Sequence, residues 1–166
     1  MDAETAGLVS SLREQLDRLT ALVRTLLEMS NLQSVSRTDQ IALAPLVEEI
    51  LTDLTPLAQK NNISLQQDCA ELGMVGSDAL IYRLVFNLVE NGIKYNRPGG
   101  AVYVTLRQEK QAAVLRVADT GPGIPADCRD SIFQPFFRVD KSRSREMGGV
   151  GLGLALVREI AVLHGG

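Results

Sequence analysis

Phe-Asn-Leu-Val-Glu-Asn-Gly-Ile-Lys-Tyr-Asn, residues 86–96, predicts the second half of a helix with a core on one side and polar chemistry on the other. At about 100° per residue, one arc of roughly 100° holds Asn87, Asn91, Lys94 and Tyr95. Apolar side chains fill the neighbouring arc. Two carboxamides one turn apart, followed by a cation and an aromatic ring, suit a hydrated metal ion, a phosphate chain and a flat base. The alternative, a polar solvent face with capping residues, stays open on this stretch alone.

Composition limits the classes of function. At 166 residues and 45% hydrophobic content, the chain is long enough for one domain plus an additional element. A net charge of −3 and an aromatic content of 4% give no general basis for nucleic-acid binding. Cys69 and Cys128 lack the spacing of a zinc site or a disulfide framework, which favours a reducing compartment. The sequence has no signal peptide and no apolar run of the roughly 18 residues that span a bilayer, so we expect a soluble, cytosolic chain.

A long amphipathic helix is predicted over residues 4–32, which contain no proline. The steps of four and three between Leu12, Leu16, Leu19, Val23 and Leu26 are those of a heptad seam. Because an isolated amphipathic helix is marginal in water, we expect a homodimer through this helix, or a helical hairpin. The alternative is a helix that lies on its own domain.

The rest of the chain divides into a linker and one domain. Residues 34–40 are polar and unpatterned, so we expect a linker between the helical segment 1–33 and a globular domain 41–166. Within this domain, strands are predicted near 41–43, 63–67, 74–75, 102–106 and 114–118, with helices over 45–60, 78–95 and 153–163. Helices and a mixed sheet in this order favour an α+β two-layer sandwich.

Asp119-Thr120-Gly121-Pro122-Gly123-Ile124 directly follows a predicted strand. A carboxylate at a strand end can accept a hydrogen bond from an exocyclic amine such as that of adenine. The two glycines allow the backbone to approach a ligand closely. The alternative is an ordinary Asp-Thr-Gly turn.

Gly148-Gly149-Val150-Gly151-Leu152-Gly153 opens the last predicted helix. Glycines at a helix start expose backbone N–H groups, and the helix dipole adds to their attraction for an anion, so phosphate is the expected ligand. The motif is neither a P-loop, because no Gly-Lys-Ser/Thr closes it, nor a dinucleotide fingerprint, because Leu154 replaces the last glycine.

Between these motifs lies Ile-Phe-Gln-Pro-Phe-Phe-Arg-Val-Asp, residues 132–140. Its three phenylalanines are predicted to anchor the segment. The following residues are rich in cations, namely Lys141, Arg143 and Arg145. We expect them to form a mobile lid over a polyphosphate; the alternative is a solvated charged loop.

Taken in chain order, the four motifs resemble the N, G1, F and G2 boxes of the ATP-binding domain of bacterial sensor histidine kinases. That family belongs with gyrase, Hsp90 and the mismatch-repair ATPases. The resemblance covers about residues 41–166, and residues 18–27 are similar to the second helix of the family's dimerisation and phosphoacceptor hairpin. It implies a Bergerat-type fold and transfer of the γ-phosphoryl group of MgATP to a histidine. The partner implied is a response-regulator receiver domain, and the parent protein would be associated with a membrane.

The resemblance also implies roles for individual residues. Asn87 and Asn91 would bind Mg²⁺, Lys94 would contact phosphate, Tyr95 would pack near the adenine and Asp119 would read its amine. Glu90 would face the edge of the site, and the resemblance assigns it no specific role. The remaining nucleotide-binding residues implied are Gly121, Gly123, Ile124, Phe136, Arg138, Lys141, Arg143, Gly149, Val150, Gly151, Leu152 and Gly153. The residues expected to take part in catalysis are Asn87, Glu90, Lys94 and Arg138.

Two departures from the family matter. The phosphoacceptor segment is absent, and the only histidine, His164, is expected to have a structural role at a helix C-terminus. The family usually continues into two further strands, so we expect a truncated sheet with weak stability or intermolecular pairing. The chain is therefore predicted to bind ATP without phosphorylating itself in cis. The alternatives are a related ATPase or anti-sigma-factor serine kinase, and a non-catalytic dimerisation scaffold.

Overall fold

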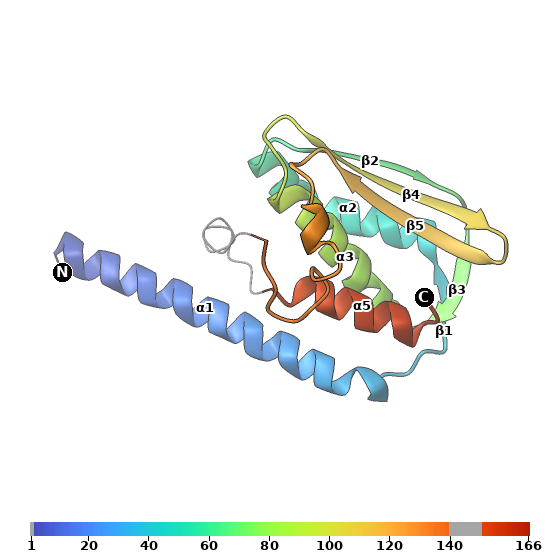
Figure 1. The fold of residues 1–166 in the computed structure, drawn as a ribbon, viewed down its shortest axis with the longest axis horizontal. Coiled ribbons are helices and arrows are strands. Elements are labelled where there is room, and N and C mark those ends of the chain that lie inside the picture. Colours follow the sequence, from blue (N-terminus) through green and yellow to red (C-terminus); the bar gives the residue numbers. More distant parts are fainter. Residues whose placement is uncertain (1, 140–150) are drawn as a thin grey trace.

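A layer of helices packs against one face of a small sheet, as the computed structural model shows (Figure 1). The structure describes residues 2–139 and 151–166. Its helices are α1 (Ala3–Asn31), α2 (Leu43–Lys60), α3 (Asp78–Lys94) and α5 (Gly153–Leu163), with short 3₁₀ turns η1 (Leu32–Ser34) and η2 (Ala126–Cys128). The predicted α+β two-layer architecture is confirmed.

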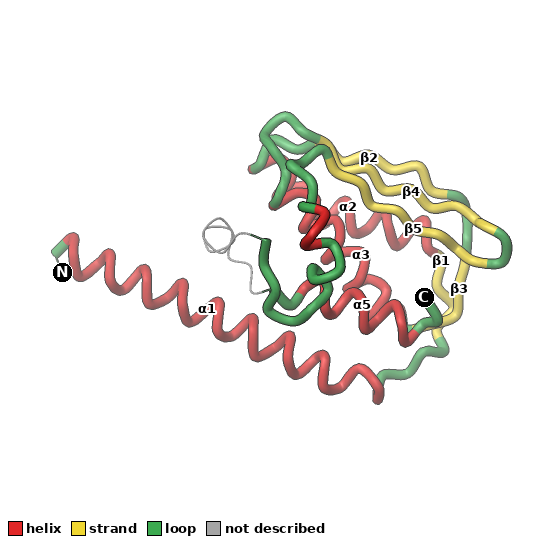
Figure 2. Tube along the Cα trace, viewed as in Figure 1, coloured by secondary structure: helices red, strands yellow, loops and turns green. Residues whose placement is uncertain are grey.

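The strands form two sheets in the described part of the chain (Figure 2). In the larger one, β2 (Ser64–Cys69) runs parallel to β4 (Ala101–Glu109), which pairs antiparallel with β5 (Ala112–Asp119). In the smaller one, β1 (Asp39–Ala42) pairs antiparallel with β3 (Gly73–Gly76). The strand β1 therefore begins inside residues 34–40, for which the sequence predicts a linker, because Asp39 and Gln40 pair with Gly76 and Val75 of a distant segment.

The core lies between the larger sheet and the helices, chiefly α2 and α3. Val102 and Val104 of β4 are fully buried, and so are Val85 and Val89 of α3. Tyr103, between the two core valines of β4, is exposed, as the alternation of side chains along a strand requires. Burial of these apolar side chains fixes which face of α3 points away from the sheet.

The helix α1 extends away from the body of the molecule (Figure 1). Its C-terminal end contacts the domain, where Leu32 is buried and Glu28 lies 3.3 Å from Arg83 of α3. The predicted seam residues Leu12 and Leu16 are 64% and 63% exposed. The alternative of a helix lying along its own domain is therefore wrong for most of the helix length, whereas dimerisation stays a prediction.

None of the helices in the described ranges combines the length and apolar character needed to cross a bilayer. Both cysteines are free thiols, and burial raises the pKa of the Cys69 thiol.

Candidate functional site

The helix α3 supplies the centre of the site. It begins at Asp78, is capped by the Ser77 hydroxyl, which accepts a hydrogen bond from Leu80 N, and ends at Lys94. The core residues Val85 and Val89 fix its rotation, because both are fully buried. The predicted amphipathic helix is thus confirmed.

Asn87 is the most constrained polar residue of this helix. Its side chain is only 9% exposed, and its buried Nδ2 has no hydrogen-bond partner among the described residues. A Cβ placed on Gly153 would lie 3.7 Å from Asn87 Oδ1, so the carboxamide faces the start of α5. Buried polar groups are normally hydrogen-bonded, so this amide is an exception within the described part of the chain.

The start of α5 offers a second polar feature next to Asn87. Leu152 occupies the N-cap position and makes no side-chain hydrogen bond to the first turn. A helix start without a capping side chain leaves N–H groups available, and the dipole favours an anion there. The Leu152 side chain itself is 2% exposed, so contact between this residue and a nucleotide would come from its backbone.

Gly151 is required where α5 meets the phenylalanine-rich segment. Its φ is +78°, and a Cβ would lie 2.9 Å from the backbone of Phe136. Phe136, also at positive φ (+66°), donates its N–H to the Gly151 carbonyl at 2.8 Å. A side chain at Gly151 would therefore push this segment away from α5.

The anchor predicted from three phenylalanines is only partly formed. Phe137 is half-buried, but Phe133 and Phe136 are 36% and 54% exposed. The prediction that all three anchor the segment is wrong. The backbone contact with Gly151, rather than burial of the rings, holds this end of the segment.

Asp119 ends β5 and lies against α3. A Cβ placed on Gly92 would sit 3.6 Å from the Asp119 Cβ, so the glycine in α3 admits the strand end. Asp119 Oδ1 accepts a hydrogen bond from Gly121 N at 2.8 Å. Among the described residues, no donor reaches the other oxygen, Oδ2.

The glycines after Asp119 differ in their surroundings. A Cβ on Gly121 would lie 2.7 Å from Asp119 Oδ1 and 2.8 Å from Tyr95 O, so the chain has no room for a side chain there. Gly123 has a φ of +76° and open space around it. Tyr95 and Ile124 are 39% and 42% exposed. Of these residues, Gly121 is the one that packs between the end of α3 and the end of β5.

The charged residues near the site are distributed unequally. Lys94 Nζ forms an ion pair with Glu90 Oε1 at 2.8 Å, one helical turn earlier, and Asn91 between them is half-buried. Arg138 is half-buried, and it forms no ion pair with another described residue. Lys94 would have to leave Glu90 in order to contact a phosphate, whereas Arg138 has no ion pair with residues 2–139 or 151–166 to break.

Five predicted residues, Lys141, Arg143, Arg145, Gly149 and Val150, lie outside the described residues. Their roles remain expectations.

His164 has the structural position expected of it. It caps the C-terminal end of α5, where Nδ1 lies 2.8 Å from Ile160 O and Nε2 accepts a hydrogen bond from Ser77 N at 3.0 Å. A Cβ on Gly76 would lie 2.6 Å from the imidazole ring. Both ring nitrogens are thus engaged in holding α5 against the start of α3.

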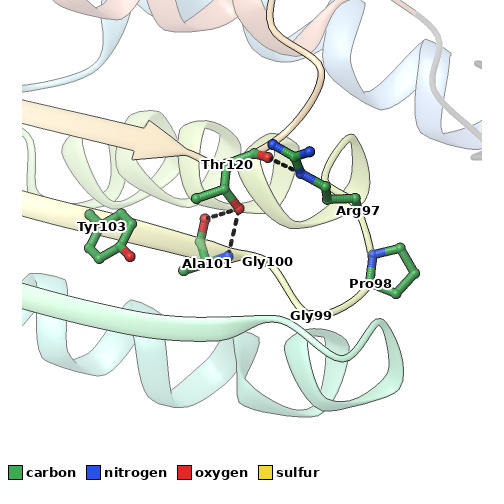
Figure 3. A pocket seen from close by; sticks show the side chains of 7 residues that line it. All are labelled: Arg97, Pro98, Gly99, Gly100, Ala101, Tyr103 and Thr120. Atoms are coloured by element: carbon green, nitrogen blue, oxygen red, sulfur yellow. Dashed lines mark hydrogen bonds between the residues drawn. The ribbon is translucent and has the colours of Figure 1, made fainter.

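A polar cluster beside Asp119 was not predicted from the sequence. Asn96 is only 8% exposed, and its Oδ1 lies 3.1 Å from Thr120 Oγ1. Figure 3 shows Thr120 also bonded to Ala101 and, through its carbonyl, to Arg97. The adjacent cavity of about 280 Å³ contains none of the predicted site residues; it is lined by Arg97, Pro98, Gly99, Gly100, Ala101, Tyr103 and Thr120. Periodicity gives no signal for such contacts, because Asn96 and Thr120 are 24 positions apart.

Residues 76–166 match the family model described as histidine kinase-, DNA gyrase B- and HSP90-like ATPase. The chain is 37% identical to the sensor histidine kinase RppB of Synechocystis sp., and the match covers 98% of this chain and 37% of RppB. Full-length ShkA in complex with AMPPNP has a TM-score of 0.79 and 26% identity, covering 99% of this chain and 35% of ShkA. Histidine kinase ThkA in complex with the response regulator TrrA gives a TM-score of 0.75 and 24% identity, covering 100% of this chain and 47% of that chain. The chain thus spans less than half the length of these proteins.

Proposed function

This chain belongs to the family of histidine kinase-, DNA gyrase B- and HSP90-like ATPases, and from that premise we propose that it binds MgATP beside α3 and donates the γ-phosphoryl group to a histidine. That histidine would be supplied by another segment or chain. The adenine would lie at Asp119, and the phosphates would lie between Asn87 and the start of α5.

The buried amide of Asn87 is the observation that carries this proposal. Its Nδ2 has no hydrogen-bond partner in the described part of the chain, and the Oδ1 of the same carboxamide would lie 3.7 Å from a Cβ on Gly153 at the start of α5. A phosphate oxygen placed there would accept from this amide and from the N–H groups of the first turn of α5. A solvent-exposed carboxamide would give no such indication.

Asp119 supports the other end of the pocket. Gly92, five residues beyond Asn87 on α3, lies against Asp119, which puts the two ends roughly 7.5 Å apart along the helix axis. An elongated ligand with a base at one end and anionic groups at the other fits this order of features. Asp119 Oδ2 would accept a hydrogen bond from the amine of the base, while Asp119 Oδ1 keeps its hydrogen bond from Gly121 N.

Asn87 and Asn91 would hold the Mg²⁺ ion. Both are carboxamides one turn apart on α3, and carboxamide oxygen is a ligand that Mg²⁺ accepts together with phosphate oxygens and water. When bound, the ion would neutralise phosphate charge and orient the triphosphate.

The other polar residues would act by position and charge. Arg138, which pairs with no described carboxylate, is available to stabilise negative charge on the transferred group. Lys94 would exchange Glu90 for a phosphate oxygen on binding, which would free the Glu90 carboxylate at the edge of the site. Catalysis would thus come from positioning and electrostatic stabilisation.

We propose that the acceptor histidine lies outside residues 1–166, because both nitrogens of His164, the only histidine in these residues, are hydrogen-bonded. The exposed seam of α1 would pair with a second copy. A response-regulator receiver domain would receive the phosphoryl group, by analogy with ThkA, whose structure is known in complex with the response regulator TrrA. The longer parent protein would carry the membrane association.

Calorimetric titration of the chain with AMPPNP and Mg²⁺ tests the pocket. We expect binding that depends on Mg²⁺ in the wild type and is lost in Asp119→Asn. Asp17→Asn, an exposed aspartate on α1, serves as the matched control and should bind normally. A folded wild-type chain that binds no nucleotide would refute the proposal and favour the scaffold function.

A transfer assay tests the acceptor. The chain with labelled ATP should remain unlabelled by itself and should label an added helical hairpin that carries a phosphoacceptor histidine. Base-stable, acid-labile phosphate on the hairpin identifies phosphohistidine, whereas acid-stable phosphoserine would indicate the serine-kinase alternative. Label on His164 would contradict its structural assignment.

A further inference from the structure

The hydrogen-bonded cluster next to Asp119 has no role in the function proposed above. It joins three segments, because Asn96 follows α3, Ala101 begins β4 and Thr120 follows β5. All three meet at the point where the chain leaves the sheet for Gly121. The cluster therefore adjoins the turn from Asp119 to Gly121, which carries the carboxylate that would read the base.

Both ends of the Asn96 carboxamide are hydrogen-bonded. Its Nδ2 donates to Ala101 O at 3.0 Å, and its Oδ1 accepts from Arg97 N at 2.9 Å. The Thr120 hydroxyl also donates to Asn96 Oδ1 at 3.1 Å. Because a backbone N–H can only donate, these contacts admit one orientation of the carboxamide.

Thr120 is equally well satisfied. Its Oγ1 accepts from Ala101 N at 2.9 Å, and its backbone N–H donates to Ala101 O at 3.1 Å. Its carbonyl accepts from Arg97 Nε at 2.7 Å, as Figure 3 shows. A Cβ on Gly100 would lie 2.4 Å from Asn96 Oδ1 and 2.5 Å from Thr120 Oγ1, so the backbone packs tightly over the cluster.

We infer that Thr120, held by Asn96 and Arg97, is a positioning residue that fixes the Asp119 carboxylate for recognition of the exocyclic amine of adenine. Thr120 is adjacent to Asp119 in the chain, and every polar group of Thr120 is tied to α3's end or to β4. The turn that carries Asp119 Oδ1 to Gly121 N therefore cannot rotate without breaking these bonds. The inference rests on the proposed nucleotide site.

A ratio of affinities isolates this role from stability. We would measure the affinity of the chain for ATP and for purine riboside triphosphate, the analogue with a hydrogen in place of the exocyclic amine. In the wild type, ATP should bind roughly 10-fold to 100-fold more tightly, as expected for one hydrogen bond to a charged acceptor. A general loosening of the fold would lower the affinity for both nucleotides by the same factor and would leave the ratio of the affinities unchanged.

Thr120→Val should lower this ratio at least threefold, whereas Thr120→Ser, which keeps the hydroxyl, should retain it. Thr105→Val is the matched control, because Thr105 lies farther along β4 and should leave the ratio unchanged. Should Thr120→Val fail to fold by circular dichroism, Arg97→Ala decides instead. The Arg97 side chain is exposed, and among the described residues its one hydrogen bond is to the Thr120 carbonyl. We therefore expect Arg97→Ala to lower the ratio of the two affinities two- to threefold.

The outcomes separate the two levels of the proposal. A wild type that binds both nucleotides equally would overturn the assignment of Asp119 as the amine acceptor, and this inference with it. A discriminating wild type together with a folded Thr120→Val chain of unchanged ratio would overturn the positioning role alone. An unchanged ratio in Arg97→Ala, where that variant decides, would do the same.

Discussion

Replacing His164 with phenylalanine should destabilise the folded chain by about 1–3 kcal/mol. The substitution keeps an aromatic ring but removes the acceptor for Ser77 N and the contact with Ile160 O. Ser77 is 2% exposed, so its N–H would stay buried without a partner, and an unsatisfied buried donor costs about this much. The Ile160 carbonyl is within reach of His164 N in the helix backbone, so its loss adds less.

Urea denaturation followed by circular dichroism measures this change, and a thermal melt should show a fall in Tm of about 2–12 °C for a chain of this size. Val162→Ala, at a 59% exposed position on the same helix, should stay within about 0.5 kcal/mol of the wild type. His164→Gln, which can still accept from Ser77 N, should recover part of the loss. A phenylalanine variant as stable as the Val162→Ala control would show that these bonds do not hold α5.

Three other predictions concern separate parts of the molecule. Gly121→Ala should weaken ATP binding at least tenfold in a calorimetric titration, because the added Cβ would lie 2.7 Å from the Asp119 carboxylate at the end of β5. The control Gly73→Ala should bind ATP normally, because its Cβ would lie 3.4 Å from the nearest atom. The hydrogen bond to Asp53 raises the pKa of Tyr82 to about 12, so an ultraviolet titration should show one tyrosine ionising late, and Asp53→Ala should remove that late phase. Since the pKa of the folded state is the higher one, any stabilisation from this pair is present below about pH 10 and is lost as the pH rises through about 12. Leu16→Glu, at a 63% exposed seam position, should reduce the mass found by light scattering to that of a monomer without lowering the Tm of the domain; a wild-type chain that is already monomeric would refute the seam.

The sequence predicted the features that depend on local pattern. The apolar periodicity of α3 determined its buried face, and the alternation of Val102 and Val104 identified β4. The turn signals after Asn96 marked the helix end correctly, because proline and glycine act on neighbouring residues. Position on a periodic element was thus sufficient to predict that Asn87 and Asn91 share a face.

Features that depend on distant partners could not be predicted in the same way. The start of β1 at Asp39 depends on pairing with Gly76, and the exposure of Phe133 and Phe136 depends on which surfaces the rest of the chain leaves free. The Asn96–Thr120 hydrogen bond joins the end of a helix to the end of a strand. In each case the residue types were visible, but the contact was not.

The pairing of α3 with α5 connects the structural histidine to the phosphate end of the site. His164 contacts Ser77 at one end of the pair, and Gly153 lies against Asn87 at the other, so the two helices run antiparallel over about 15 Å. Because a helix is stiff along its axis, a slip of α5 at His164 moves Gly153 relative to Asn87 by the same amount. A shift of about 1 Å is enough to misplace a catalytic group. We therefore expect the folded His164→Phe chain to bind ATP more weakly than its loss of stability alone would explain.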